Sequence, residues 1–222
     1  MLVQIYGITT PEDAAMVAGL APDHAGVVVD EGIGTWDSVD EATAVAIVAR
    51  LAGTRVVALS LSSDPARIVR TTDLLAPHVV HLARVADRLS PAEVAALRRA
   101  VRPAELMVTI PVRGPEAVEL ARRYEPSADY LLLDTADPAS GVVGASGLVH
   151  DWAVSAAVVA AVDVPVVLAG GLGPHNVVEA IERVRPAGVD SETHTSFSHD
   201  RRRKDPEKVQ RFIDLARRPL TP

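Results

Sequence analysis

The stretch Asp129-Tyr-Leu-Leu-Leu-Asp-Thr135 decides the fold, because it is a short apolar run that ends on an acidic residue. The glycine-rich stretch Gly144-Ala-Ser-Gly147 follows it along the chain. Short runs rich in Val, Leu and Ile, with little polar alternation, are typical of parallel strands that are buried on both faces. An acidic side chain at the end of such a strand, beside a loop that can approach an anion, is suited to proton transfer.

Similar apolar runs recur along the 222 residues and alternate with helical patterns. Strand–helix units of roughly 25–30 residues favour an α/β fold that closes as a (β/α)8 barrel, because an open doubly wound sheet would usually have fewer strands. We expect a single domain over residues 1–222. The predicted strands are 2–6, 25–30, 55–60, 79–83, 105–112, 129–134, 164–169 and 186–190, and the predicted helices are 11–20, 38–52, 64–75, 91–101, 115–124, 152–162, 175–185 and 205–217.

Capping residues and prolines predict where several of these helices begin. A serine or aspartate side chain can accept from the first backbone N–H groups of a helix, and proline fits its first turn. The starts predicted in this way are Ser38, Ser90-Pro91, Gly114-Pro115, Gly173-Pro174 and Asp205-Pro206.

Composition excludes several classes of protein. The net charge of −7 argues against a nucleic-acid partner, which would favour a basic face. Hydrophobic residues make up 48%, but no apolar run approaches the ~18–20 residues of a membrane helix. The amino terminus reads as a strand, without a positive leader or a cleavage site, so we expect a soluble cytoplasmic protein. The chain has no cysteine, which excludes thiol nucleophiles and thiolate metal sites.

The lysines exclude a further class. Lys204 and Lys208 are the only two in the chain, and both lie near its carboxyl end. A Schiff-base aldolase needs a lysine that is desolvated inside its pocket. Because none lies on the first seven predicted strands, the sequence argues against that class.

Catalytic residues of such barrels come from the carboxyl ends of the strands. The predicted strand ends therefore give the candidates for the site. They are Tyr6, Asp30, Ser60, His81, Thr109, Asp134, Gly170-Gly171 and the stretch from Asp190 onward.

Two glycine-rich turns predict a phosphate site. Glycine lets backbone N–H groups approach an anion closely, and the loops after strands seven and eight often hold phosphate in barrels. After strand eight, hydroxyl groups could contribute as well. The candidate phosphate ligands are Gly144, Ser146, Gly147, Gly170, Gly171, Ser191 and Thr193.

At several positions the chain resembles the phosphoribosylanthranilate isomerase family, the barrel enzymes of tryptophan biosynthesis. The similarity spans nearly the whole length. The residues that carry it are Ile5-Tyr-Gly-Ile-Thr9, Asp13-Ala14, Leu131-Leu-Leu-Asp-Thr135, Gly144-Ala-Ser-Gly147 with Asp151-Trp152, Leu168-Ala-Gly-Gly-Leu172 with Asn176-Val177, Val184-Arg-Pro186 with Gly188-Val-Asp190, and Lys204-Asp-Pro-Glu-Lys-Val209.

The resemblance implies an Amadori rearrangement, in which an aldose amine becomes a 1-amino-1-deoxyketose. In that family an acid protonates the ring oxygen and a base removes the C2 proton. The implied acid is the aspartate that ends strand six, Asp134 here. The family's base is a cysteine in Lys-Ile-Cys-Gly-Ile-Thr, whereas this chain has Tyr6 in Gln4-Ile-Tyr-Gly-Ile-Thr9. Since a phenol has a pKa near ~10, Tyr6 is a poor base at neutral pH.

Three more differences from the family surround the same site. The family's arginine for the anthranilate carboxylate is replaced by the acidic stretch Asp30-Glu-Gly-Ile-Gly-Thr-Trp-Asp37. Strand four has His81-Leu-Ala83 in place of Gln-Leu-His, and strand eight continues as Ser191-Glu-Thr-His-Thr195 in place of Ser-Ser-Gly-Val-Glu. An imidazole titrates near ~6.5, so His81 is a candidate replacement base, or else a satisfied core histidine. Asp30 is a further candidate base.

Several readings of the individual residues remain open. Asp190, Glu192 and His194 alternate and could face one metal, which would suit a metal-assisted sugar-phosphate epimerase or aldolase. A non-catalytic phosphosugar-binding barrel is the other alternative. The run His199-Asp-Arg-Arg-Arg-Lys204 predicts a solvated face or, less commonly, a phosphate clamp. Trp152 is expected to pack, and Trp36 to stack on a ring or cover its loop.

The sequence thus predicts an aldose–ketose isomerase of a phosphorylated amino sugar. We expect no cofactor, no nucleic acid and no membrane as partner, and either a monomer or a homodimer.

Overall fold

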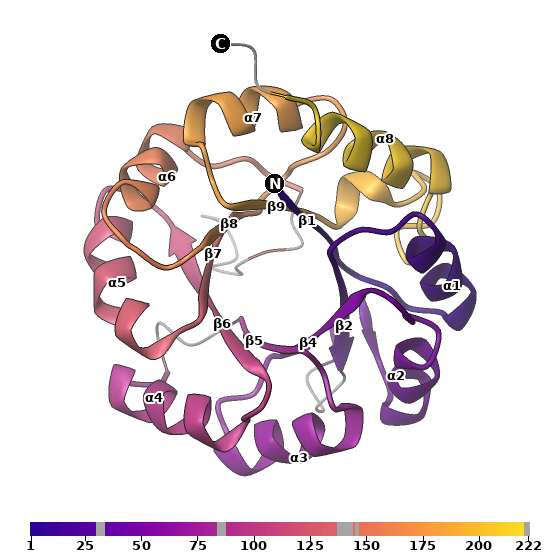
Figure 1. Ribbon diagram of the computed structural model, residues 1–222, viewed down its shortest axis with the longest axis horizontal. Helices are drawn as coiled ribbons and strands as arrows, with labels where there is room; N and C mark the ends of the chain where they lie inside the picture. The colour runs from indigo at the N-terminus through magenta and orange to yellow at the C-terminus, as the bar shows by residue number, and fades with distance from the viewer. Residues whose placement is uncertain (30–33, 84–87, 137–143, 145–146, 220–222) are drawn as a thin grey trace.

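Eight parallel strands form a closed barrel in the computed structural model, which describes residues 1–29, 34–83, 88–136, 144 and 147–219 (Figure 1). The strands are β1 (Leu2–Ile5), β2 (His24–Val29), β4 (Arg55–Ser60), β5 (Val79–Leu82), β6 (Glu105–Val112), β7 (Tyr130–Thr135), β8 (Val166–Leu168) and β9 (Gly188–Ser191). They pair in the order β1-β9-β8-β7-β6-β5-β4-β2, and the pairing of β1 with β2 closes the ring. The predicted (β/α)8 barrel is therefore confirmed.

The helices surround the ring of strands on the outside (Figure 1). Each follows a strand, and every helix before α8 returns the chain to the start of the next strand, as parallel pairing requires. They are α1 (Pro11–Gly19), α2 (Glu41–Val48), α3 (Pro65–Leu75), α4 (Pro91–Ala100), α5 (Ala117–Tyr124), α6 (Trp152–Val159), α7 (Val177–Val184) and α8 (Pro206–Ala216).

Capping side chains set the helix starts, and three of the predicted starts are wrong. Helix α2 begins at Glu41 because the carboxylate of Asp40 accepts from the backbone N–H of Thr43 at 2.7 Å. The predicted cap Ser38 instead lies in β3 (Ser38–Val39), a two-residue strand that pairs with β2.

Helices α5 and α7 begin after their Gly-Pro turns rather than at them. The backbone N–H of Gly173 donates to Asn176 Oδ1 at 2.9 Å, which holds that turn outside α7. The starts of α4 and α8 are confirmed, since the side chains of Ser90 and Asp205 accept from the first turns of these helices.

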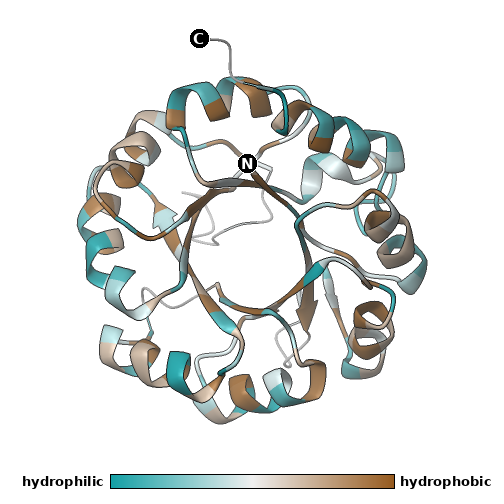
Figure 2. Cartoon of the chain, in the orientation of Figure 1, coloured by the Kyte–Doolittle hydropathy of each residue, from teal (hydrophilic) through white to brown (hydrophobic). Residues whose placement is uncertain are grey.

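Apolar side chains fill both sides of the ring. The larger cluster lies between the strands and the helices, and the apolar faces of the helices turn toward the barrel (Figure 2). A smaller cluster comes from alternate strand positions and fills the interior, so the barrel is packed rather than a pore. Its buried members are Tyr6, Val28, Val57, Val79, Met107, Leu132, Val167 and Ala169.

The alternation of strand residues also determines which polar groups point inward. Asp134 lies two residues beyond Leu132, and Thr109 lies two beyond Met107, so both share the inward face at the carboxyl end of the barrel. None of the helices in the described residues is long and apolar enough to cross a bilayer.

Candidate active site

Asp134 lies at the carboxyl end of β7 and is half-buried in the barrel mouth. The backbone N–H of Thr135 donates to its Oδ1 at 2.7 Å. A Cβ on Gly144, whose φ is +82°, would lie 2.6 Å from Asp134 Oδ2, so only glycine fits beside this carboxyl. Burial raises the pKa of Asp134 to about 7, against the smaller opposing effect of the Thr135 hydrogen bond. A carboxyl with this pKa can hold a proton and release it near neutral pH.

Asp190 lies on the next strand but one, β9, and extends the acidic surface of the mouth. Its Oδ1 accepts from Gln4 Nε2 at 3.2 Å, and the Oε1 of Gln4 in turn contacts His24 Nδ1 at 3.1 Å. Burial raises the pKa of Asp190 to about 8, and the charge of Asp134 adds to the effect. The carboxyls of Asp134 and Asp190 are therefore electrostatically coupled across the mouth.

Glu192 follows β9, and its carboxyl hydrogen-bonds with that of Asp37 from the loop before β3. Burial raises the pKa of Glu192 well above its usual value, and the charge of Asp37 raises it further. Both effects favour the protonated form of Glu192, as expected for a buried carboxyl beside another carboxyl. Glu192 Oε1 is buried and has no hydrogen-bond partner among the described residues.

Lys204, in the loop before α8, is 1% exposed and supplies the positive charge of this cluster. Its Nζ donates to the backbone oxygen of Glu192 at 2.8 Å and to Ser196 Oγ at 2.9 Å. Burial lowers the pKa of Lys204 to about 8, although the carboxyls of Glu192, Asp190, Asp13 and Asp37 act in the opposite direction. This lysine fixes the loop after β9 and neutralises part of the acidic charge.

A small cavity of about 20 Å³ joins these groups at the mouth. This is room for about one water molecule. Asp134, Asp190 and Glu192 contribute its carboxyl groups, and the turn after β8 and the loop after β9 contribute much of the remaining lining. The cavity is lined by Asp134, Gly147, Gly170, Gly171, Leu172, Asp190, Ser191, Glu192, Thr193 and His194.

Two of the candidate bases, Tyr6 and His81, are bonded to each other inside the barrel. The phenolic oxygen of Tyr6 lies 3.0 Å from His81 Nδ1, and His81 Nε2 lies 2.7 Å from Thr109 Oγ1. Tyr6 is 4% exposed and its ring covers Gly26, where a Cβ would lie 2.6 Å from the ring. Burial raises the pKa of Tyr6 well above 10 and lowers that of His81 to about 3. These contacts favour the reading of His81 as a satisfied core histidine.

Five of the candidate phosphate ligands line the cavity, namely Gly147, Gly170, Gly171, Ser191 and Thr193, whereas Gly144 lies beside Asp134. The carbonyl oxygen of Gly147 lies 3.2 Å from His194 Nε2. Gly170 and Gly171 have φ values of +82° and +65° at the turn after β8. The hydroxyl of Ser191 donates to Leu172 O at 2.7 Å and is thus used within the fold. Asp30 and Ser146 lie outside the described residues.

The basic run before α8 is not simply a solvated face. Arg203 donates to both carboxyl oxygens of Asp13 at 3.0 Å, and the backbone N–H of Lys204 reaches Asp13 Oδ2 at 2.9 Å. Arg202 donates to the backbone oxygens of Trp36 and Ser38. These contacts tie the loop to α1 and to the loop before β3, because a buried carboxylate such as Asp13 needs charged or N–H partners.

The two tryptophans also have defined positions. Trp152 is 7% exposed and packs in the outer core, as expected. The guanidinium of Arg201 lies 4.4 Å from the ring centre of Trp36, so this ring already has a cationic partner.

The structure does not support the hypothesis that Asp190, Glu192 and His194 bind one metal ion. Among the described residues, no three potential ligands gather as a metal site would need. His194 Nε2 is instead beside the carbonyl of Gly147, and Glu192 pairs with Asp37.

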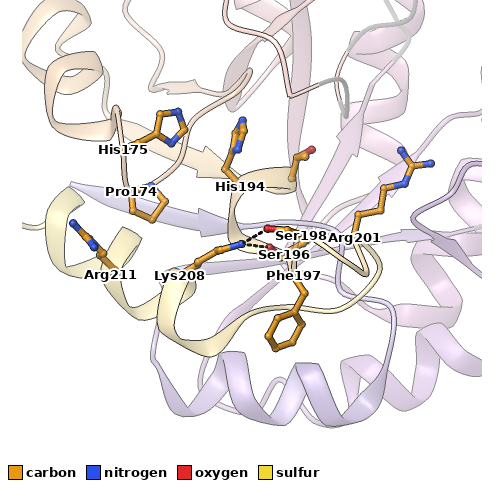
Figure 3. Close-up of a pocket in the computed structure, with 10 residues that line it drawn as sticks. Pro174, His175, His194, Ser196, Phe197, Ser198, Arg201, Lys208 and Arg211 are labelled. Atoms are coloured by element: carbon orange, nitrogen blue, oxygen red, sulfur yellow. Dashed lines mark hydrogen bonds between the residues drawn. The ribbon is translucent and has the colours of Figure 1, made fainter.

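A larger cavity of about 610 Å³ lies on the outer side of the loop after β9 (Figure 3). His175 and His194 stand together on one side, with ring centres 4.8 Å apart, and Lys208 and Arg211 extend from α8 (Figure 3). Lys208 Nζ donates to Ser196 O at 2.8 Å. The lining contains arginines, a lysine and histidines but no carboxylate among the described residues, so this cavity is suited to an anion.

Sequence reasoning missed the roles of Asp37 and Lys204 and noted Glu192 only as a metal ligand. Each lies in a loop, and their contacts join segments far apart in the chain. One signal was present in the sequence. Asp37 ends the acidic stretch 30–37, and Lys204 follows the stretch 191–195, and both stretches differ from the family pattern.

The comparisons with known proteins agree with the fold. The family described as N-(5'phosphoribosyl)anthranilate (PRA) isomerase matches residues 4–214. The N-(5'-phosphoribosyl)anthranilate isomerase of Methanocella arvoryzae is 35% identical over 97% of this chain and 97% of its own length. That of Methanopyrus kandleri is 34% identical over 95% of this chain and 96% of its own.

A solved structure gives the same result in three dimensions. The phosphoribosyl anthranilate isomerase of Thermus thermophilus superposes with a TM-score of 0.80 and is 25% identical. The match covers 97% of this chain and 98% of the other.

Proposed function

Because the chain belongs to the N-(5'-phosphoribosyl)anthranilate isomerase family, we propose that it isomerises an N-(5′-phosphoribosyl) amine of this type, with N-(5′-phosphoribosyl)anthranilate as the nearest substrate. The reaction converts the aldose amine to a 1-amino-1-deoxyketose. The observation that carries the proposal is Asp134, an inward carboxyl at the barrel mouth whose pKa is raised to about 7 by burial.

Asp134 is the proposed acid. Its carboxyl holds a proton over much of the neutral range, because burial disfavours the charged form. It delivers this proton to the ring oxygen while the bond from that oxygen to C1 breaks. The resulting carboxylate keeps one strong partner, the backbone N–H of Thr135. A positioned acid of this kind typically contributes ~10²–10⁴-fold to the rate.

The substrate's anionic groups need the opposite surroundings. We place the phosphate at the turns of Gly147 and Gly170-Gly171, where backbone N–H groups can approach it. The cavity with Lys208 and Arg211 adjoins this side of the mouth and shares His194 with it. The positive charge of these groups offsets the repulsion that the mouth carboxyls would exert on a phosphate.

The direct test is an assay with N-(5′-phosphoribosyl)anthranilate, following the loss of its fluorescence. We expect turnover by the wild-type chain and a fall in kcat of ~10²–10⁴-fold in Asp134→Asn, because the amide cannot donate the same proton. The matched control is Asp163→Asn, which changes an aspartate between α6 and β8, away from the mouth.

Three outcomes separate the alternatives. Turnover that depends on Asp134 supports the proposal. Turnover that is equal in Asp134→Asn refutes the role of this residue. No turnover, together with a thermal shift caused by phosphorylated sugars, would identify a binding barrel instead.

A further inference from the structure

We propose that Glu192 is the general base that removes the C2 proton, in place of the missing thiol on β1. The inference rests on the proposed isomerase function. Glu192 comes from the loop after β9, yet its side chain reaches across to the end of β1. It also lines the same small cavity as Asp134.

The contact with β1 places the carboxyl where the reaction needs it. A Cβ on Gly7 would lie 2.9 Å from Glu192 Cγ and would collide with its Oε1. Gly7 directly follows Tyr6, the position of the thiol in the related isomerases. Because Gly7 has no side chain and a φ of +69°, it leaves the space that Glu192 fills. The carboxyl thus replaces the thiol in position, although it comes from another strand.

The unpartnered oxygen points to a ligand. Glu192 Oε1 is buried and has no hydrogen-bond partner among the described residues, although the Glu192 carboxyl as a whole interacts with that of Asp37. Burying an acceptor without a partner is energetically unfavourable. Such a group is retained where catalysis uses it.

The other candidates are placed less well. The phenol of Tyr6 is bonded to His81 and its pKa is raised, so it does not ionise near neutral pH. The imidazole of His81 has a pKa of about 3 and is a weak base. Asp190 already accepts from Gln4 Nε2 at 3.2 Å, so one of its carboxyl oxygens is used within the fold.

The acid and the base complete a balanced cycle. Asp134 protonates the ring oxygen as the C1–O bond breaks, and the nitrogen lone pair forms the C1=N bond. The Glu192 carboxylate then takes the C2 proton, the C–H electron pair forms C1=C2, and the C1=N pair returns to nitrogen. Finally Glu192 returns its proton to C1, while the hydroxyl on C2 gives its proton to Asp134 and becomes the ketone. Both carboxyls return to their starting states.

The charged groups that face Glu192 set its proton affinity. Asp37 and Asp190 raise its pKa, and Lys204 lowers it. Tyr6 lies on the β1 side, and its own pKa is raised by burial first and by the charges of Asp190, Glu192 and Asp37 in addition. A base of raised pKa accepts a proton more strongly, and the charge of Lys204 favours the ionised form that acts as the base. Asp37 is thus a positioning residue that acts through Glu192.

The experiment compares Glu192→Gln, Glu192→Ala and the exposed control Glu207→Gln in the fluorescence assay. We expect kcat to fall ~10²–10⁴-fold in Glu192→Gln with KM changed less than about tenfold, because the base acts on the transition state. In Glu192→Ala, added formate should restore at least about tenfold of the lost rate by supplying a carboxylate in the vacated space. Chloride at equal concentration should not. Melting temperatures of all variants check their folding.

Each result decides a different point. Loss in Glu192→Gln with rescue of Glu192→Ala by formate supports the base. Wild-type kcat in Glu192→Gln, or loss that formate does not rescue in a folded Glu192→Ala, overturns it while leaving the isomerase function intact. Loss of kcat in Tyr6→Phe alone would assign the base to the phenol. No turnover by the wild-type chain rejects the isomerase function, and the assignment of Glu192 with it.

Discussion

The barrel interior and the barrel mouth both bury polar groups, but they treat them differently. In the interior, Tyr6, His81 and Thr109 form a chain in which each group has a partner. At the mouth, Asp134 has one backbone partner and Glu192 has an oxygen with none among the described residues. The two regions are neighbours along the strands, since Asp134 lies two residues beyond Leu132 of the interior cluster.

The two regions differ in the pH at which their groups exchange a proton. Burial shifts the pKa of a group toward its neutral form, and His81, with a pKa of about 3, stays neutral at physiological pH. The mouth carboxyls of Asp134 and Asp190 have pKa values of about 7 and about 8, where a proton can be gained or lost. The buried carboxyls of the mouth therefore destabilise the folded protein when they are ionised, whereas the hydrogen-bonded groups of the interior do not.

The largest stability effect is expected from Lys204→Met, which removes the one buried cation of the mouth described here. The ammonium would leave Ser196 Oγ and the backbone oxygen of Glu192 unpaired, and the nearby carboxyls uncompensated. Removing one partner of a buried charge cluster typically costs about 3–5 kcal/mol. Urea unfolding would measure this difference.

Lys208→Met is the matched control, because Lys208 is only half-buried and lies one turn farther along. We expect a loss below about 1 kcal/mol there. Equal losses of unfolding free energy in the two variants would contradict the view that Lys204 stabilises the fold by compensating the buried carboxyls of the mouth.

A second test follows the stability of the mouth with pH. Burial raises the pKa of Asp190 to about 8 in the folded state, above its ordinary value of 3.8. The stability that its protonated form contributes is therefore fully present below about pH 4 and is lost as the pH rises through about 8. Asp190→Asn resembles the protonated acid, so this variant should be more stable than the wild type at pH 8 by about 1–3 kcal/mol.

The unfolding free energies of the wild type and Asp190→Asn should differ little near pH 4, which gives the internal control. Denaturant unfolding at several pH values measures how the unfolding free energy of each protein changes with pH. A wild-type stability that rises between pH 5 and pH 8 in step with Asp190→Asn would show that Asp190 is ionised in the folded state.

Much of this architecture could be predicted from the sequence. The apolar runs gave strands within one or two residues, since burial on both faces leaves a strong local signal. Asp134, Asp190, Tyr6 and His81 were all expected at strand ends, and the structure places each of them on the inward face or at its rim. The barrel closure then explains why they share one end.

The partners of these residues could not be predicted in the same way. Tyr6 and His81 are 75 residues apart in the sequence. Their contact forms because the side chain of Tyr6, which follows β1, extends through the barrel interior to His81 on β5. That contact favours a core histidine over a base, and only the folded chain brings the two rings together. Glu192, Asp37 and Lys204 lie in loops, where no periodicity fixes the direction of a side chain.

The smallest effect is expected in the interior, from Tyr6→Phe. The change removes the phenolic oxygen and leaves His81 Nδ1 without its partner, which costs about 1–2 kcal/mol. Thr109→Val is the matched variant, since it removes the partner of Nε2 on the same ring, and we expect a similar loss. Thermal unfolding compares the two, and the fluorescence assay follows any turnover. Because neither hydroxyl lines the mouth cavity, kcat should stay within about tenfold of the wild type in both variants. A Tyr6→Phe protein that melts normally but has lost its activity would place the phenol in the chemistry and erase the distinction between the satisfied interior and the reactive mouth.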